Sequence, residues 1–467
     1  MTAPARTAAF HALRAIAANR ADLPAALAHS RQRLSDERDR ALAAEIVTGT
    51  LRWQRSLDFL IEHFAKRPLR KLDSDVVTIL RLSLYQLMHL DRVPAAAVVD
   101  DAVDMTRGAR KGSAAGFVNA VLRATLRQRN RLPFPARPGD SAKRHSDSAK
   151  RHSDSAKRDA QLAYLGVTLS HPEWLVARWL DRHGFEAAER WTQFNNETPR
   201  LTLRANTLRT GREGVAVALA ADGIGTEPTR WAPDGLVVTE GNPLRRPLEG
   251  AFFVQDEASQ LVPLTLAVTA GQTVLDLCAS PGGKTTAIAA QMGDTGLVIA
   301  SDVRSKRMAL LRETVRQSGA RAIRVVQVPA SGALPFSGTF DRVLVDAPCS
   351  GLGTIRRDPD IRWRRTEADL PALARDQRTL LARAAAVVSP GGRLVYATCS
   401  SEPEENEAVV DAFLAEHADF TLADLRGDDA APLAPFIDAR GMMRTVPFEH
   451  GLEAFFAAAV IRRYSAD

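Results

Sequence analysis

Two cysteines and an aspartate lie where predicted strands end in the C-terminal half of the chain. Asp346 and Cys349 end the stretch FDRVLVDAPC, and Cys399 ends GGRLVYATC. Parallel strands of an open sheet present their carboxyl ends at one shared edge, where ligands bind. A single cysteine is most often a small buried residue, but two thiols and a carboxylate at one edge indicate nucleophilic and acid–base chemistry.

A glycine turn follows another apolar, strand-like run within TVLDLCASPGGKTT. Pro281, Gly282 and Gly283 predict a turn, and a helix is expected to begin near Lys284. Glycines allow the backbone to approach a ligand, although a purely structural strand-to-helix turn would use the same residues. The spacing matches neither a phosphate-binding loop nor a dinucleotide fingerprint.

Asp302 ends the next apolar run, at the place where nucleoside-binding sheets carry an acid that accepts hydrogen bonds from ribose hydroxyls. The alternative for Asp302 is an N-cap of the helix that begins near Arg304. A nucleoside without a pyrophosphate is therefore indicated. S-adenosylmethionine (SAM) meets that description.

The elements around these residues alternate as in a doubly wound α/β domain, which we place at 251–467. Strands are predicted at 297–301, 323–328, 340–345 and 393–397, and helices at 304–318, 369–389 and 404–416. A small α+β module is predicted at 161–250, from a helical stretch followed by PRLTLRANTLR, GLVV and AFFVQD.

Residues 1–130 are predicted to form an all-helical bundle, because apolar positions recur at helical spacing, as in Val76, Ile79 and Leu80. A polar repeat, SAKRHSD, follows from Ser141 to Asp159. It has no apolar anchors, so we predict that residues 131–160 form a disordered linker. No thiol or carboxylate cluster accompanies its two histidines, and we expect no metal site.

Composition indicates a multidomain cytoplasmic protein. The 467 residues suffice for about three domains. The net charge of +7 is concentrated at the front: residues 1–130 carry +8, residues 131–160 carry +4 and the remainder −5. Such a cationic front indicates a polyanionic partner, although a general compositional bias would also produce it. Three scattered cysteines are typical of a reducing compartment, and neither a signal peptide nor a membrane span is expected.

Two stretches of the front bundle, LAAEIVTGTLRWQRSLDFLI and AAGFVNAVLR, resemble the NusB family of RNA-binding helical domains. The resemblance implies that Arg52, Arg55, Arg67 and Arg70 are candidate phosphate contacts. A solvated helix face is the alternative for each of them.

Four further stretches, FFVQDEASQL, LDLCASPGGKT, DAPCSGLGTIRRDPDIRW and YATCSSEPEENE, resemble the RsmB/Sun family of 16S ribosomal RNA cytosine-5 methyltransferases. The resemblance implies SAM-dependent methylation of carbon 5 of a cytosine through a covalent cysteine–cytosine intermediate. Cys399 is implied as the nucleophile, Cys349 in product release and Asp346 in binding the base near the cofactor. The residues implied to contact SAM are Cys278, Ala279, Ser280, Pro281, Gly282, Gly283, Lys284, Asp302 and Asp346.

The middle segment of the family is also recognisable in SHPEWLVARWL and FNNETPRLTLRANTL. The resemblance implies RNA contacts by Arg204 and Asn206 there, and by Arg356, Arg357 and Trp363 after the first thiol turn. Stabilisation of a turn, a strand edge or a helix start is the alternative for these residues.

The chain departs from the family pattern at two places. Pro329 stands where an aspartate usually reads the adenine amino group, and its side chain offers no hydrogen-bonding group. Glu453 and Ala454 stand where the family usually shows Asp-Gly. The expected partner is small-subunit ribosomal RNA, bound by a monomer. The alternatives are the same chemistry on transfer RNA and a non-catalytic RNA-binding or ribosome-assembly factor.

Overall fold

The computed structural model describes residues 2–139, 147–245, 248–427 and 432–464, which form two compact units. Met1–Thr198 and Ile355–Glu367 form the helical unit, and Pro199–Thr354 and Ala368–Asp467 form the sheet unit. These limits differ from the expected domain boundaries, because residues 161–198 group with the helical unit. They also divide the predicted methyltransferase domain, since a segment that follows the Cys349 turn belongs to the helical unit.

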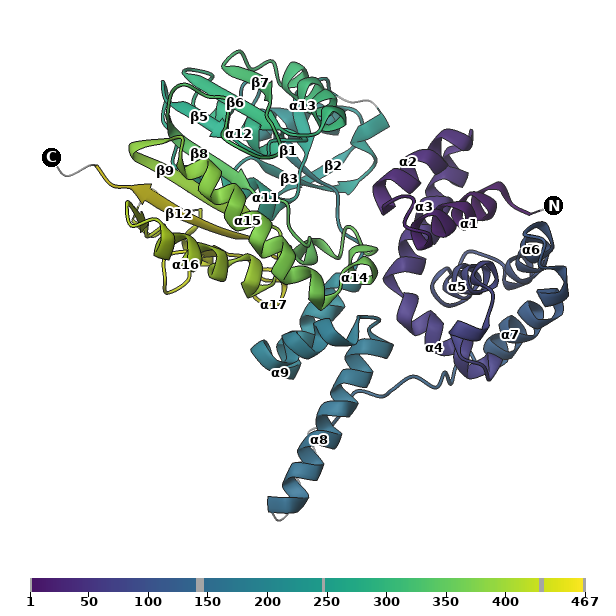
Figure 1. Ribbon diagram of the computed structural model, residues 1–467. Coiled ribbons are helices and arrows are strands. Elements are labelled where there is room, and N and C mark those ends of the chain that lie inside the picture. Colours follow the sequence, from purple (N-terminus) through teal and green to yellow (C-terminus); the bar gives the residue numbers. More distant parts are fainter. Residues whose placement is uncertain (1, 140–146, 246–247, 428–431, 465–467) are drawn as a thin grey trace. The chain divides into compact units, whose positions relative to one another are not determined.

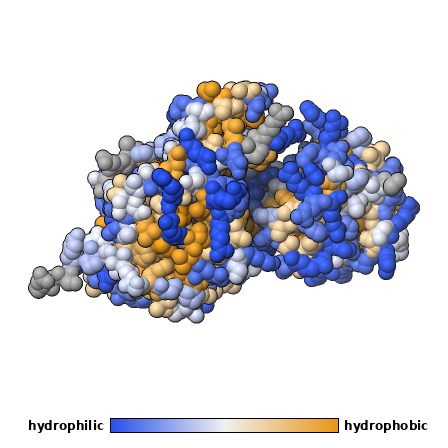
Figure 2. All heavy atoms as spheres, turned by 90° about the horizontal axis from the view of Figure 1, so that it is seen from above, coloured by the Kyte–Doolittle hydropathy of each residue, from blue (hydrophilic) through white to orange (hydrophobic). Residues whose placement is uncertain are grey.

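Helices make up the first unit, as the apolar spacing predicts. Its α5 (Ser74–His89) lies at the core of the bundle, with Ile79, Leu80 and Leu82 completely buried. Hydrophilic residues cover much of the visible face of this bundle in Figure 2. The other helices of the unit are α1 (Pro4–Ala17), α2 (Leu23–Arg33), α3 (Glu37–Arg52), α4 (Gln54–Ala65), α6 (Ala95–Gly108), α7 (Ala115–Arg127), α8 (Asp147–Ala163), α9 (Glu173–Asn196) and α14 (Ile361–Arg364) (Figure 1).

Part of the predicted disordered linker is helical. Helix α8 covers Asp147–Ala163 and so includes repeat residues as far as Asp159. Lysine, arginine and alanine have high helix propensity, and Arg158 pairs with Asp181 of α9 at 3.0 Å. The expectation of disorder is therefore corrected for the C-terminal part of the repeat. Its first residues, up to position 146, lie outside the described residues.

The sheet unit begins with a small antiparallel sheet in the order β2-β3-β1-β4. This is the predicted α+β module, whose strands carry the PRLTLRANTLR, GLVV and AFFVQD stretches. Its elements are β1 (Thr202–Ala205), α10 (Arg212–Ala221), β2 (Gly225–Pro228), β3 (Gly235–Glu240) and β4 (Phe252–Val254).

The second sheet has eight strands, of which seven follow the order β10-β12-β9-β8-β5-β6-β7. Strands β9, β8, β5, β6 and β7 are parallel, and β10, β11 and β12 form an antiparallel edge. The strands are β5 (Thr273–Asp276), β6 (Leu297–Asp302), β7 (Ile323–Gln327), β8 (Phe340–Asp346), β9 (Val388–Thr398), β10 (Phe420–Leu422), β11 (Met443–Arg444) and β12 (Phe456–Arg462).

Helices cover both faces of this sheet, as in a doubly wound domain. Along β8, Val343 and Val345 join the apolar cluster that includes residues of α15 and α16, whereas Leu344 joins the cluster that includes residues of α12 and α13. This alternation buries both sides of each central strand. The helices are α11 (Glu257–Leu261), α12 (Gly283–Gln291), α13 (Ser305–Ser318), α15 (Leu370–Ala385), α16 (Glu407–Glu416) and α17 (Pro447–His450) (Figure 1).

Candidate active site

The carboxyl ends of four adjacent strands bring the predicted site residues to one edge. Strands β9, β8, β5 and β6 are neighbours in that order. Cys399 follows β9, Asp346 ends β8, Cys278 follows β5, and Asp302 ends β6. The register pairs Asp346 with Ala397, close to the end of β9. The expectation that the two strand ends share one edge of the sheet is therefore confirmed.

The two thiols are in direct contact. The Sγ atoms of Cys349 and Cys399 are 3.3 Å apart. The hydrogen bond with Cys399, together with burial, raises the pKa of the Cys349 thiol well above its ordinary value. Either sulfur can donate this hydrogen bond, so the contact brings both thiols to one point of the sheet edge.

Lys284 extends from the start of α12 to Asp346. Its Nζ donates a hydrogen bond to Asp346 Oδ2 at 2.7 Å. Burial disfavours the charged ammonium, but the negative charges of Asp346 and Cys399 outweigh this and raise the pKa of Lys284. The predicted cofactor residue Lys284 therefore directs its ammonium to Asp346 and interacts electrostatically with Cys399.

The turn between β5 and α12 has the form that its sequence predicts. Gly282 adopts a φ of 108°, which favours glycine, and α12 begins at Gly283. Asp276 before the turn is buried, and burial raises its pKa to about 7. Thr285 donates to its Oδ2 at 2.6 Å, while Oδ1 is buried without a hydrogen-bond partner. A buried acceptor beside an open glycine turn fits a polar ligand such as SAM.

Asp302 also fits such a ligand. Its Oδ1 accepts a hydrogen bond from the backbone N–H of Arg304 at 3.1 Å, and Arg304 itself caps α13 without a side-chain hydrogen bond. Asp302 is therefore not the N-cap of that helix. Its carboxylate lies at the carboxyl end of β6, where ribose hydroxyls could donate to it.

The turn after Cys349 lies against the segment around Cys399 through its backbone. Gly353 N–H donates to the Cys399 carbonyl at 2.9 Å, and Ala454 N–H donates to the Gly353 carbonyl at 3.0 Å. A Cβ on Gly353 would lie 1.9 Å from the Ala454 oxygen, so only glycine fits. Ala454, which departs from the family pattern, thus lies close to the Cys399 segment. It contributes its backbone N–H, which other residues would also supply.

Arg204 and Asn206 have structural roles, so the RNA contacts expected of them are corrected. Arg204 is buried and donates to Gln255 Oε1 at 2.7 Å and Thr286 Oγ1 at 2.7 Å. Asn206 is fully buried and donates to the carbonyls of Gly250 and Ser318. The first of these networks connects the small antiparallel sheet to α12, which carries Lys284.

The segment after the first thiol turn packs inside the helical unit. Trp363 Nε1 donates to the Leu51 carbonyl at 2.6 Å, and the Arg356 guanidinium lies 3.9 Å from the centre of the Phe194 ring. Arg362, which sequence reasoning did not single out, is completely buried and donates to three backbone carbonyls, those of Arg52, Ser170 and Asn195. The RNA contacts expected of Arg356 and Trp363 are therefore corrected to structural roles, whereas Arg357 stays a prediction.

Two of the four predicted phosphate contacts of the front bundle are likewise structural. Arg52 is buried and donates to the Arg356 carbonyl at 3.1 Å. Arg55 donates to the His171 carbonyl and pairs with Glu173 at 3.0 Å. Arg67 and Arg70 are exposed and stay predictions.

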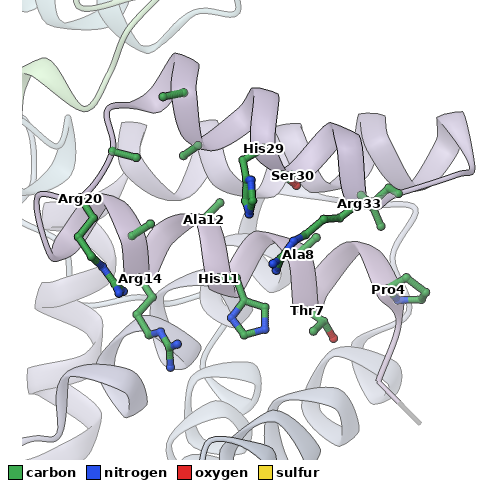
Figure 3. Close-up of a pocket in the computed structure, with 15 residues that line it drawn as sticks. Pro4, Thr7, Ala8, His11, Ala12, Arg14, Arg20, His29, Ser30 and Arg33 are labelled. Atoms are coloured by element: carbon green, nitrogen blue, oxygen red, sulfur yellow. The ribbon is translucent and has the colours of Figure 1, made fainter.

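A groove between α1 and α2 is lined by three arginines and two histidines. It has a volume of about 640 Å³ and an alanine-rich floor. His29 and Arg33 of α2 point toward α1 in Figure 3, and His11, Arg14 and Arg20 complete the rim. None of the described residues that line it is acidic. Arg14, Arg20 and Arg33 are therefore part of the positive charge of the front bundle.

The loop after β7, in which Pro329 occurs, has its backbone fixed by one arginine. Arg383 of α15 donates to the carbonyls of Pro329, Ala330 and Gly332 at 2.8, 3.1 and 2.7 Å. The side chains of Pro329 and Ser331 are exposed. The loop therefore has a defined path although it lacks the expected carboxylate.

Neither a candidate metal cluster nor a helix able to span a membrane occurs in the described parts of the chain. Within them, no cluster of three or more histidine, cysteine, aspartate or glutamate side chains has an arrangement that could bind a metal ion. The same residues contain no helix with the length and apolar character needed to cross a membrane.

Comparisons with known proteins agree with this architecture. The family model described as 16S rRNA methyltransferase RsmB/F matches residues 263–461, the NusB family matches 3–127, and the ferredoxin-like domain of RsmF/B-like methyltransferases matches 171–245. A crystal structure of a protein named PH0851 is 26% identical, with a TM-score of 0.78 over 98% of this chain and 99% of that one.

Two curated relatives extend over most of the chain. One is the probable ribosomal RNA small subunit methyltransferase B of Bacillus subtilis, 34% identical over 441 residues that cover 92% of each chain. The other is the ribosomal RNA small subunit methyltransferase B of Pseudomonas putida, 35% identical over 88% of each chain. With these similarities added to its fold, the chain belongs to the RsmB/F family of ribosomal RNA methyltransferases.

Proposed function

We propose that this protein methylates carbon 5 of a cytosine in small-subunit ribosomal RNA, with SAM as the methyl donor and Cys399 as a covalent catalyst. The observation that supports this most directly is the pair of thiols 3.3 Å apart, beside an ion pair formed by Lys284 and Asp346. The names of the curated relatives support the choice of small-subunit RNA. The cationic groove between α1 and α2 offers contacts for RNA phosphates.

SAM supplies an electrophilic methyl group when it is bound. Asp302 would accept hydrogen bonds from its ribose, and the turn from Cys278 to Lys284 would surround the rest of the nucleoside. Burial and the acids nearby raise the pKa of the Cys278 thiol. Cys278 therefore stays a neutral thiol and does not compete with Cys399 as a nucleophile.

Cys399 attacks carbon 6 of the cytosine. A bond forms between its sulfur and carbon 6, and the electron pair of the 5,6 double bond moves toward carbon 5, which becomes nucleophilic. The ammonium of Lys284, held by Asp346, interacts electrostatically with Cys399. Asp346, paired with an ammonium, is a hydrogen-bond acceptor, which suits the exocyclic amino group of cytosine.

Product release requires loss of the carbon 5 proton. A base removes that proton, the electron pair re-forms the 5,6 double bond, and the thiolate of Cys399 leaves carbon 6. Cys399 carries no negative charge while it is bonded to the base, so one of the causes that raise the pKa of Cys349 is removed. Cys349 can then lose its proton to solvent and accept the one from carbon 5.

The test is methyl transfer from labelled SAM to 16S RNA by the purified full-length protein. Cys399→Ala should abolish transfer and leave SAM binding intact. Cys349→Ala should accumulate a protein–RNA adduct that survives denaturing electrophoresis, because attack proceeds and release does not. Full activity in Cys399→Ala would show that Cys399 is not the nucleophile. Methylation of transfer RNA alone would show that transfer RNA is the substrate. SAM binding without methyl transfer to either RNA would favour a non-catalytic factor.

A further inference from the structure

Glu405 is a buried carboxylate that contacts both thiol-bearing turns. It ends the 3₁₀ turn η8 (Pro403–Glu405) and has no exposed surface. Its Oε1 accepts a hydrogen bond from the backbone N–H of Ser350 at 2.8 Å, and its Oε2 accepts one from Ser400 Oγ at 2.5 Å. Ser350 directly follows Cys349, and Ser400 directly follows Cys399. One side chain therefore links the two segments that carry the sulfurs.

The serine hydroxyls complete this link. The Oγ atoms of Ser350 and Ser400 are 3.2 Å apart, and Ser400 Oγ also accepts the N–H of Glu402 at 3.1 Å. The hydroxyl proton of Ser400 is thus directed to Glu405. Asn406 fixes the same turn, because it accepts from Thr398 Oγ1 at 2.6 Å and donates to the Ser400 carbonyl at 3.0 Å.

The carboxylate also distinguishes the two thiols electrostatically. Gln377 Nε2 donates to Oε1 at 2.9 Å, so the contacts to both oxygens come from donors, the pattern of an ionised carboxylate. Among the described residues, Cys349 interacts electrostatically with Cys399, Glu405 and Tyr396. After the hydrogen bond to Cys399, burial and the charge of Cys399, the charge of Glu405 further raises the pKa of Cys349.

Building on the proposed two-thiol reaction, we propose that Glu405 is a positioning residue for it. Its carboxylate fixes the separation of the two sulfurs, and its negative charge disfavours a thiolate at Cys349. The ammonium of Lys284 interacts electrostatically with Cys399. Before the base is attacked, Glu405 therefore keeps Cys349 as a thiol and leaves Cys399 as the nucleophile.

The charge is tested by the pH dependence of iodoacetamide labelling, with Cys278, Cys349 and Cys399 read separately by peptide mass spectrometry. In folded Glu405→Gln, the half-labelling pH of Cys349 should fall by about one unit, because the opposing charge is lost. Glu405→Asp, which keeps the charge, should retain most of the parent profile. Glu404→Gln is the matched control on the same turn. An unchanged Cys349 profile in Glu405→Gln would overturn the electrostatic role.

The geometry is tested by diamide, which oxidises two neighbouring thiols to a disulfide and is itself reduced to a hydrazine. The rate of Cys349–Cys399 disulfide formation should fall about fivefold or more in both Ser400→Ala and Glu405→Gln, as expected when a small displacement separates two reacting atoms. Ser400→Ala keeps the buried charge of Glu405, so this variant alone tests the separation of the sulfurs if Glu405→Gln does not fold. Parent-like oxidation in the folded variants would show that Glu405 does not set the separation.

A methyl transfer assay distinguishes failure of the positioning role of Glu405 from failure of the proposed function. Glu405→Gln should lower kcat about tenfold and leave the Kd for SAM unchanged, because it displaces thiols and not cofactor contacts. Unchanged kcat would overturn the positioning role. If the parent enzyme transfers no methyl group to RNA, the proposed function fails, and the labelling and oxidation experiments still decide whether Glu405 positions the thiols.

Discussion

Asp276 shows how one buried side chain sets a pH dependence. Burial raises its pKa to about 7 from an ordinary value of 3.8, so the folded chain binds a proton that the unfolded chain releases between these values. Stability is therefore lost as the pH rises from about 4 to about 7, by up to about 4 kcal/mol from this group. Above that range the full cost of the buried charge is present.

Asp276→Asn should remove this cost. The variant is nearly isosteric and can still accept the hydrogen bond from Thr285. We expect its melting temperature to exceed that of the parent most at pH 8, less at pH 6 and least at pH 4.5. Thermal unfolding of both proteins in the absence of SAM measures the difference, with the exposed Asp222→Asn as control. A difference that is constant with pH would contradict the prediction.

At the residue scale, the side chains that meet at one edge of the sheet are more predictable from the sequence than the contacts each of them makes. Asp346, Cys349 and Cys399 were identifiable because each follows an apolar strand, and strand order determines which ends meet. The family resemblance places Lys284 with the cofactor residues, but the sequence does not predict that its ammonium binds Asp346. A long side chain on the first turn of a helix can extend in several directions, and only its surroundings select one. Glu405, in the EPEENE stretch, gave no local signal of its role because its partners belong to other turns.

At the scale of elements, the loop after β7 tests how much the cofactor site depends on one carboxylate. Arg383 fixes the loop by three backbone carbonyls, so its path is independent of the side chain at Pro329. Pro329→Asp should therefore add an acceptor for the adenine amino group without moving the loop, and tighten SAM binding about tenfold, the value of one good hydrogen bond.

Calorimetry of SAM binding to the purified protein measures this change. Arg383→Ala should weaken SAM binding instead, because the loop loses its fixed path, and Arg378→Ala on the exposed side of the same helix is the matched control. Equal SAM affinity in the parent and Pro329→Asp would show that the loop does not reach the adenine.

Some elements are predictable from the sequence and others are not. The strands and helices of the sheet unit follow from the spacing of apolar residues and from the positions of glycine and proline. The predicted and observed bounds of β6, β7, β8 and α13 agree within about two residues. The segment Ile355–Glu367 contains only one short helix and many charges, so a surface RNA-contact loop was the natural expectation. Its burial depends on carbonyls of α3 and α9, which no local pattern reveals.

At the scale of the whole molecule, the helical unit is discontinuous in sequence. Met1–Thr198 forms most of it, but Ile355–Glu367 completes it. Arg362 donates to the carbonyls of Arg52, Ser170 and Asn195, and Asp360 accepts the N–H of Leu23 at 3.2 Å. These contacts join parts of the chain that no local sequence pattern links. Division of the sequence at composition changes therefore cannot recover the boundaries of this unit.

A fragment of residues 1–198 should consequently be less stable alone than with the missing segment supplied as a peptide. We expect a synthetic peptide of residues 355–367 to bind the fragment and, at 100 times its Kd, to stabilise it by about 2.7 kcal/mol. For a unit of this size that corresponds to a rise in melting temperature of about 5–10 °C. Circular dichroism at 222 nm, recorded during thermal unfolding with increasing peptide, measures the effect.

The control peptide carries Arg362→Met, which keeps the apolar stem of the side chain and removes every donor. In the helical unit, this change leaves buried carbonyls without a partner, and each such group costs about 1–3 kcal/mol. The control peptide should therefore need at least tenfold higher concentrations to produce the same shift. Equal shifts from both peptides would show that the segment binds through its apolar residues alone, and no shift from either would show that residues 1–198 form a complete folding unit.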